Sequence, residues 1–278
     1  MSDDSRSAFD DSAHPAQTPL RPKRKGLYIL PNAISLAALF ASFYAIVMAM
    51  NGRFESAAYG IFASAVLDSL DGRVARMTHS QSAFGEQMDS LCDMVSFGAA
   101  PALIVYEWAL RDLGKWGWFP AFVYIAGAAL RLARFNTNIG IVDKRYFQGL
   151  PSPAAAALVM GLIWVADDAG MRSVTKIDWL AWTAFAVTLY AGLSMVTNAP
   201  FYSFKDVSFK RSVPFIVIVA IALGIAVINI HPPIVLFALF CLYGMSGYAV
   251  YAYKRAKGTP VSVIATSTDE PDEAGLHR

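Results

Sequence analysis

The chain has 278 residues, of which 56% are hydrophobic and only 16% are charged. This composition lies outside the usual range of soluble domains and indicates a polytopic membrane protein. The formal net charge of +2 is too small to suggest nucleic acid binding. The two cysteines, Cys92 and Cys241, lie in apolar segments and exclude both a disulfide framework and a cysteine-based zinc site.

Hydrophobic stretches predict an all-α bundle of about eight transmembrane helices. In chain order they cover roughly residues 28–50, 55–76, 86–110, 116–136, 152–168, 178–197, 213–230 and 232–253. Residues 27–255 would form this membrane domain, between a disordered or interfacial tail over 1–26 and a disordered tail over 256–278. A cytoplasmic N-terminus places most of the 23 Lys and Arg residues in the cytoplasm. Both termini are therefore predicted to be cytoplasmic.

Four aspartates interrupt the second and third hydrophobic segments. Asp68 and Asp71 are spaced i,i+3, and Asp89 and Asp93 are spaced i,i+4, so each pair lies on one helical face. Ionisable residues inside membrane segments are costly and usually functional. Paired carboxylates without His or Cys favour a hard divalent ion, Mg²⁺ or Mn²⁺. We expect two helices to aim the four carboxylates at a common point, where one or two metal ions would also hold a phosphate compound.

Two alternatives to a ligand site start from the neighbours of these aspartates. Arg73 and Arg76 could simply pair with the carboxylates at a helix end, but two arginines cannot neutralise four carboxylates. Gly72 and Gly85 could serve close helix packing, as small residues often do in membranes. They would equally allow a nucleotide or pyrophosphate to approach the helix backbone. Their offsets from four aspartates favour the second interpretation.

The complete motif matches every position of a known family signature. It reads Asp68-x2-Asp71-Gly72-x2-Ala75-Arg76-x8-Gly85-x3-Asp89-x3-Asp93. The chain thereby resembles the CDP-alcohol phosphatidyltransferases, which transfer a phosphatidyl group from a CDP-linked lipid to an alcohol and release CMP. The resemblance implies metal ligation by all four aspartates, with Asp93 also acting as general base. The residues it implies around the CDP group are Gly72, Ala75, Arg76, Gly85 and, through a Pro-Asn pair that many members carry, Asn32.

Two later stretches bear on the acceptor alcohol. They are Arg131-Leu132-Ala133-Arg134-Phe135-Asn136 and Phe147-Gln148-Gly149-Leu150-Pro151-Ser152-Pro153. Together they resemble the phosphatidylserine synthase branch of the family, which implies CDP-diacylglycerol as donor and L-serine as acceptor. Arg131 and Arg134 could hold the lipid phosphate or the serine carboxylate, or could only anchor the helix at the membrane interface. Asn136 joins them as a candidate binding residue.

The resemblance also implies a homodimer. We expect the protein to lie in a bacterial inner membrane, and the Lys and Arg distribution places its active site at the cytoplasmic face. A phosphatidylglycerophosphate or phosphatidylinositol-phosphate synthase of the same family remains a competing prediction, because the aspartate motif does not specify the acceptor. An ion transporter is the alternative from another class. It predicts carboxylates spread along a path rather than paired on two adjacent helices.

Overall fold

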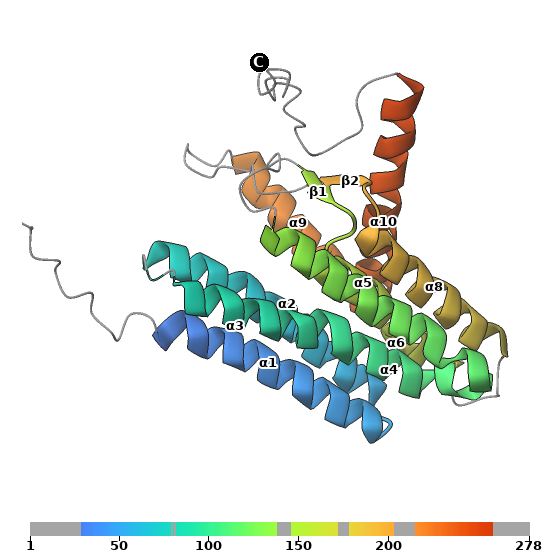
Figure 1. Ribbon diagram of the computed structural model, residues 1–278. Helices are drawn as coiled ribbons and strands as arrows, with labels where there is room; N and C mark the ends of the chain where they lie inside the picture. Colours follow the sequence, from blue (N-terminus) through green and yellow to red (C-terminus); the bar gives the residue numbers. More distant parts are fainter. Residues whose placement is uncertain are drawn as a thin grey trace, which may run out of the picture.

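The structure, a computed structural model, describes residues 29–78, 80, 82–137, 146–171, 178–202 and 215–257. Within these ranges the protein is all-α apart from one two-stranded sheet (Figure 1). The tail predicted over 1–26, and all but two residues of the tail predicted over 256–278, lie outside the described residues.

Helices occupy all eight segments predicted from hydropathy. Seven of the segments are single helices: α1 (Ile29–Met50), α2 (Phe54–Met77), α5 (Trp118–Thr137), α6 (Ser152–Asp168), α8 (Asp178–Val196), α9 (Phe215–Ile230) and α10 (Pro232–Ala256). The remaining segment is a continuous run of α3 (Ala83–Asp93), the π-helix η2 (Met94–Ala99) and α4 (Ala100–Trp108). A 3₁₀-helix, η3 (Leu110–Trp116), leads from α4 into α5.

Within the described ranges, four helical stretches are long and apolar enough to cross a membrane. They are Leu30–Met50, Ala83–Trp108, Trp179–Val196 and Pro232–Ala256. Among the others, α6 and α9 have only 17 and 16 residues, and α2 carries the charges of the aspartate motif. Membrane crossing by all eight segments therefore stays a prediction.

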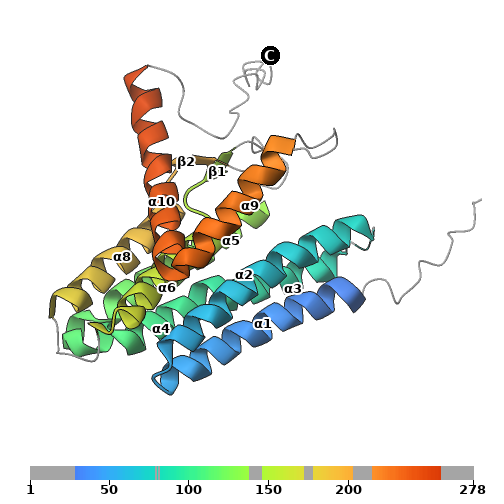
Figure 2. The ribbon, with the colours of Figure 1, turned by 180° about the vertical axis from the view of Figure 1, so that it is seen from behind.

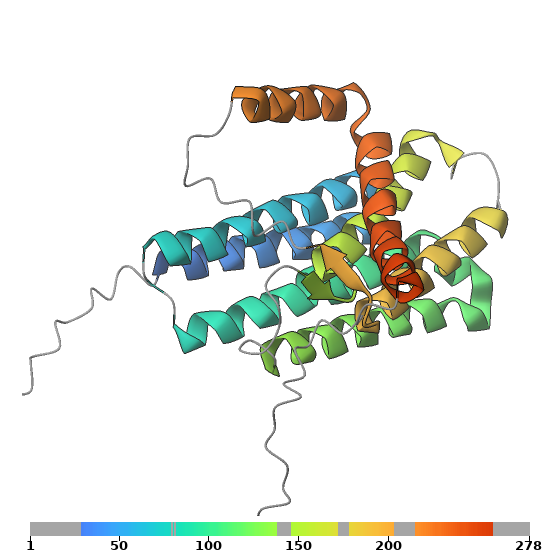
Figure 3. The same cartoon turned by 90° about the horizontal axis from the view of Figure 1, so that it is seen from above.

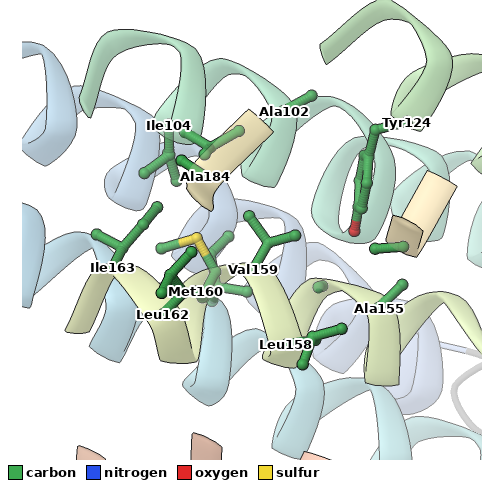
Figure 4. Close-up of a cluster of buried hydrophobic side chains, with 14 of the residues drawn as sticks. Ala102, Ile104, Tyr124, Ala155, Leu158, Val159, Met160, Leu162, Ile163 and Ala184 are labelled. Carbon is green, nitrogen blue, oxygen red and sulfur yellow. The ribbon is translucent and has the colours of Figure 1, made fainter. Parts of the chain in front are cut away.

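Helix α6 forms the centre of the hydrophobic core. Nearly all of its side chains are buried, because it is contacted by α2, α4, α8 and α10. Figure 4 shows Met160 and Ile163 of α6 beside Ile104 of α4 and Ala184 of α8. The alanine run at the start of α6 lets the neighbouring helices approach closely, as small residues do in membrane bundles.

In two other helix pairs, glycines allow the close packing. A Cβ atom added at Gly127 of α5 would lie 2.3 Å from the backbone oxygen of Gly192 on α8. One added at Gly60 of α2 would lie 2.9 Å from the backbone oxygen of Ala41 on α1. A side chain at either position would push the two helices apart. These contacts fix α1 against α2 and α5 against α8.

A short antiparallel sheet joins the start of α6 to the end of α8. Strand β1 (Tyr146–Gln148) pairs with β2 (Pro200–Tyr202), with Phe147 opposite Phe201. Gly149 follows β1 with φ +74°, a conformation that favours glycine. The first turn of α6 then accommodates a proline. The stretch from Phe147 to Pro153 thus builds the entry into α6.

The two last helices run in other directions than the rest of the bundle. Helix α10 crosses it at a steep angle (Figure 2) and packs against α6 and β2. Helix α9, the orange helix, lies to one side of the bundle (Figure 3), and its main neighbour is α10. The first helices, which carry the aspartate motif, therefore form their site without α9.

Candidate metal and nucleotide site

The motif aspartates meet at one point, as the sequence predicts. Asp68 and Asp71 project from α2 and Asp89 projects from α3, and one carboxylate oxygen of each lies within 4.8 Å of the others. The carboxyl group of Asp93, one turn after Asp89 on α3, lies beside that of Asp68 and adds the fourth member. Asp71 is buried, with 5% of its surface exposed. Paired carboxylates on two adjacent helices must converge in this way to share a metal ion.

The charge of this cluster calls for bound cations. Among the described residues, neither Arg73 nor Arg76 forms an ion pair with any of the four aspartates. The helix-end ion pairs considered above are therefore not formed. Oxygen atoms alone make up the donor set, which suits a hard divalent cation. The residues present thus fit a metal ion held by Asp68, Asp71 and Asp89.

The helix geometry changes directly after the last aspartate. The π-helix η2 begins at Met94, and its wider turn is of a kind often found at functional sites. Ser96 in η2 is buried and hydrogen-bonded to Ser42 of α1 at 2.6 Å, and Ser42 also bonds Ser64 of α2 at 2.8 Å. This buried serine cluster, Ser42, Ser64 and Ser96, connects three elements just beyond the carboxylates. No sequence signal marked it, because its members are far apart in the chain.

The beginning of α1, the end of α2 and the beginning of α3 lie together at one end of the bundle (Figure 1). A pocket lies there, against the carboxylate cluster. Its lining includes Asp71, Asp89 and all five residues predicted to surround the CDP group: Asn32, Gly72, Ala75, Arg76 and Gly85. Pro31, the partner of Asn32 in the Pro-Asn pair, also lines the pocket, together with four residues that the sequence did not single out: Ser35, Ser80, Ser82 and Glu86. Of these, Ser82 had a sequence signal, since serine favours the N-cap, and its Oγ accepts a 3.0 Å hydrogen bond from the Gly85 backbone N–H.

Close helix packing does not explain the two motif glycines. A Cβ atom added at Gly72 would have no heavy atom within 4 Å. One added at Gly85 would meet Ser82 Oγ at 3.2 Å and Asn32 Oδ1 at 3.3 Å, both atoms of pocket-lining side chains. At neither glycine would an added Cβ meet the backbone of another helix within 4 Å, in contrast to Gly60 and Gly127. Their missing side chains instead keep the pocket wall at backbone level.

Arg131 faces the carboxylate cluster from α5. It interacts electrostatically with Asp93, and its Nη1 donates a 3.2 Å hydrogen bond to Ser152 Oγ at the start of α6. Its Nε is buried and has no hydrogen-bond partner among the described residues. Burying an N–H of a guanidinium without an acceptor is costly. The position therefore has a free donor beside Asp93.

Arg134 and Asn136 contact other parts of the protein. Arg134 donates from Nη2 to the Val196 carbonyl oxygen at 3.0 Å and from Nη1 to Asn198 Oδ1 at 3.1 Å, which caps the end of α8. Asn136 donates from Nδ2 to Ser90 Oγ at 3.1 Å, one residue after Asp89. The two predicted arginines thus differ, since only Arg131 is directed at the aspartates.

Comparison with known proteins agrees with this site and fold. The profile of the CDP-alcohol phosphatidyltransferase family matches residues 28–193, from α1 through most of α8. The chain belongs to the CDP-alcohol phosphatidyltransferase family. It is an integral membrane protein, as its apolar helices and its membership of this family of membrane enzymes indicate.

Several relatives share a single enzyme name. The chain is 33% identical over 219 residues to the CDP-diacylglycerol–serine O-phosphatidyltransferase of Helicobacter pylori, an alignment that covers 79% of this chain and 90% of the relative. Enzymes of the same name from Methanocaldococcus jannaschii and Mycobacterium leprae are 32% and 30% identical. The former alignment covers 68% of this chain and 82% of the relative, and the latter covers 78% and 72%.

Proposed function

We propose that this protein transfers the phosphatidyl group of CDP-diacylglycerol to the hydroxyl group of L-serine, forming phosphatidylserine and CMP. The observation that carries the proposal is the convergence of carboxylates from α2 and α3 beside a pocket lined by the remaining residues of the motif. The name shared by the relatives supports serine as acceptor.

Asp68, Asp71 and Asp89 would hold one divalent ion, Mg²⁺ or Mn²⁺, and Asp93 would complete a site for a second. When bound, these ions supply charge stabilisation at the pyrophosphate and at the departing CMP. Hard cations match a site made only of carboxylates, whereas imidazole- or thiolate-preferring metals do not. Chelation with EDTA should therefore abolish CMP release, and adding Mg²⁺ or Mn²⁺ should restore it.

The nucleotide would occupy the pocket at the ends of α1, α2 and α3. Gly72 and Gly85 would let it approach the helix backbone, and Ala75 adds only a methyl group to the same side of the pocket. Arg76 is exposed at the pocket and is free to bind a phosphate of the CDP group through its guanidinium. Asn32 would contact the nucleotide from α1.

The acceptor would bind on the Arg131 side of the cluster. Asp93 would accept the proton of the serine hydroxyl, whose oxygen then forms a bond to the lipid-side phosphorus while the bond from that phosphorus to the CMP oxygen breaks. The free Nε of Arg131 would hold the serine carboxylate close to Asp93. Arg134 and Asn136 would shape this side of the site through α8 and Ser90.

Acceptor specificity can be tested by CMP release from CDP-diacylglycerol. Purified protein would be supplied with Mn²⁺ and with L-serine, glycerol 3-phosphate or inositol phosphate in turn. We expect CMP release with L-serine as acceptor and none with either phosphorylated acceptor. Release only with one of the phosphorylated acceptors would replace serine by that alcohol, and no release with any acceptor would contradict phosphatidyl transfer by this protein.

Asp93 as general base can be tested with a matched pair of variants. Asp93→Asn keeps the size of the side chain but cannot accept the proton, and it should lower kcat by about 100-fold or more. Asp112→Asn makes the same change in η3, outside the cluster, and should leave kcat unchanged. Full serine-dependent activity of Asp93→Asn would contradict the assignment.

The proposal extends to the topology and assembly of the protein. All eight segments would cross a bacterial inner membrane, with both termini and the carboxylate site at the cytoplasmic face. Residues 27–255 would form the catalytic membrane domain between the two tails, and two copies would form a homodimer. The Lys and Arg distribution supports this orientation. Protease treatment of sealed vesicles, with a tag at each terminus, would test the orientation. The molecular mass of the detergent-solubilised protein would test the homodimer.

A further inference from the structure

We infer that Ser35 is a positioning residue that holds the carboxylate of Asp71 in its metal-binding orientation. Ser35 lies on α1, and its Oγ donates a hydrogen bond to Asp71 Oδ2 at 2.6 Å. Both side chains are buried, with 6% of Ser35 and 5% of Asp71 exposed. The inference rests on the proposed metal site, and it adds a residue that lies outside the aspartate motif.

The contact has the properties of a strong and specific hydrogen bond. A hydroxyl-to-carboxylate distance of 2.6 Å is within the range of charge-assisted bonds. The same Oγ also lies 3.2 Å from the backbone oxygen of Pro31, one turn earlier, which keeps the hydroxyl beside its own helix. One hydroxyl proton cannot serve both acceptors fully, and the shorter distance favours the carboxylate. The Ser35 hydroxyl therefore donates its hydrogen bond mainly to Asp71.

This bond has a consequence for the metal site. The backbone N–H of Gly72 also lies near the Asp71 carboxylate, but it belongs to the same helix, α2. Without the donor from α1, the carboxylate can turn about its side-chain torsion, which would move its oxygens away from those of Asp68 and Asp89. Hydrogen bonds to ligating carboxylates fix the ligand, and their loss typically lowers metal affinity or activity 10- to 100-fold. Because Ser35 lies on α1 and Asp71 on α2, the Ser35 hydroxyl is a direct means by which α1 orients this ligand.

Ser35 also connects the metal ligand Asp71 with the nucleotide pocket. Its side chain lines the pocket together with Asn32, one turn earlier on α1, and with Gly72, which follows Asp71. The first turns of α1 thus line the nucleotide side and orient a metal ligand at once. A small displacement of α1 would alter both parts of the site together.

The test is direct metal binding without substrates. Binding of Mn²⁺ to the purified full-length protein would be followed by the EPR signal of the free ion. Ser35→Ala should raise the Kd for Mn²⁺ about 10-fold or more. Ser35→Thr retains the hydroxyl and should restore most of the affinity. Ser42→Ala is the matched control, because Ser42 is a buried serine on the same helix that bonds Ser64 and Ser96 instead of an aspartate.

Thermal unfolding of each variant without metal separates positioning from folding. We expect Ser42→Ala to lower the Tm and leave the Kd for Mn²⁺ unchanged, and Ser35→Ala to raise the Kd whether or not the Tm falls. Wild-type Mn²⁺ affinity in Ser35→Ala, or an equal loss in Ser42→Ala, would overturn the Ser35 assignment alone. A wild-type protein that binds no Mn²⁺ would overturn the metal site itself, and failure of serine-dependent CMP release would leave the Mn²⁺ result standing.

Discussion

The phenol oxygen of Tyr124 on α5 donates a 2.9 Å hydrogen bond to the backbone carbonyl oxygen of Phe97 in the π-helix η2. Tyr124 and Phe97 are both fully buried. A π-turn interrupts the regular hydrogen-bond ladder of a helix, so its carbonyl groups need other partners. The Tyr124 hydroxyl supplies one from a neighbouring helix. It thereby stabilises the segment that begins directly after Asp93.

Loss of this hydroxyl should destabilise the protein. Tyr124→Phe leaves the ring in place but removes the donor, so a buried carbonyl is left without its partner at a cost of about 1–3 kcal/mol. We expect a lower Tm in thermal unfolding of the detergent-solubilised protein. Tyr44→Phe, at an exposed position on α1, is the control and should leave the Tm unchanged. Equal Tm values for both variants would show that the π-helix does not need Tyr124.

A methyl group at Gly72 should impair nucleotide binding without harming the fold. The added Cβ has no protein atom within 4 Å, and alanine is favoured over glycine inside a helix by about 0.5–1 kcal/mol. Gly72→Ala should therefore keep or raise the Tm. Because Gly72 lines the pocket, the same methyl group should raise the KM for CDP-diacylglycerol about tenfold, which corresponds to about 1.4 kcal/mol.

The matched control for this prediction is Gly224→Ala. Gly224 is also a helical glycine whose added Cβ would have no neighbour within 4 Å, but it lies on α9, away from the pocket. This variant should leave the KM for CDP-diacylglycerol unchanged. If Gly72→Ala behaved like Gly224→Ala in steady-state kinetics, the nucleotide would not lie against the α2 backbone.

Substitution of Arg131 by lysine should affect the acceptor more than the lipid donor. Lysine keeps the charge but lacks the guanidinium fork and its Nε donor, which we propose binds the serine carboxylate. We expect the KM for serine to rise about tenfold or more, with a nearly unchanged KM for CDP-diacylglycerol. The reverse pattern, a raised KM for CDP-diacylglycerol alone, would assign Arg131 to the lipid phosphate.

Removal of the Arg134 side chain should mainly reduce stability. Arg134→Ala deletes hydrogen bonds to the Val196 carbonyl and to Asn198, which together fix the end of α8. Hydrogen bonds that involve a charged group are typically worth about 1.5–3 kcal/mol. The Tm should fall, while the KM for serine should change less than in Arg131→Lys. A large KM effect with an unchanged Tm would instead indicate that Arg134 binds substrate.

Much of the fold and of the carboxylate site is predictable from the sequence, for definite physical reasons. Hydrophobic segments separated by polar residues locate the helices, because a chain segment in an apolar environment must satisfy its own backbone hydrogen bonds, as a helix does. The spacing of Asp68 with Asp71, and of Asp89 with Asp93, determines that each pair shares a face. The requirement that four carboxylates be neutralised then brings the two faces together.

Other features depend on tertiary contacts that spacing does not reveal. Ser35 bonds Asp71 across 36 positions in the chain, and nothing around Ser35 distinguishes it from other serines in apolar helices. The π-helix after Asp93 leaves no mark in the hydrophobic pattern, since it adds only one wide turn to a continuous helix. The different roles of Arg131 and Arg134 likewise follow from the position of α8, not from their i,i+3 spacing.

The most direct test of the central claim is the fate of isotopically labelled L-serine. The purified protein would be incubated with CDP-diacylglycerol, Mn²⁺ and the labelled amino acid, and both lipid and CMP would be quantified by mass spectrometry. Phosphatidyl transfer to serine would give labelled phosphatidylserine and CMP in equal amounts, and both would be lost in Asp93→Asn. CMP released without any labelled lipid would contradict it.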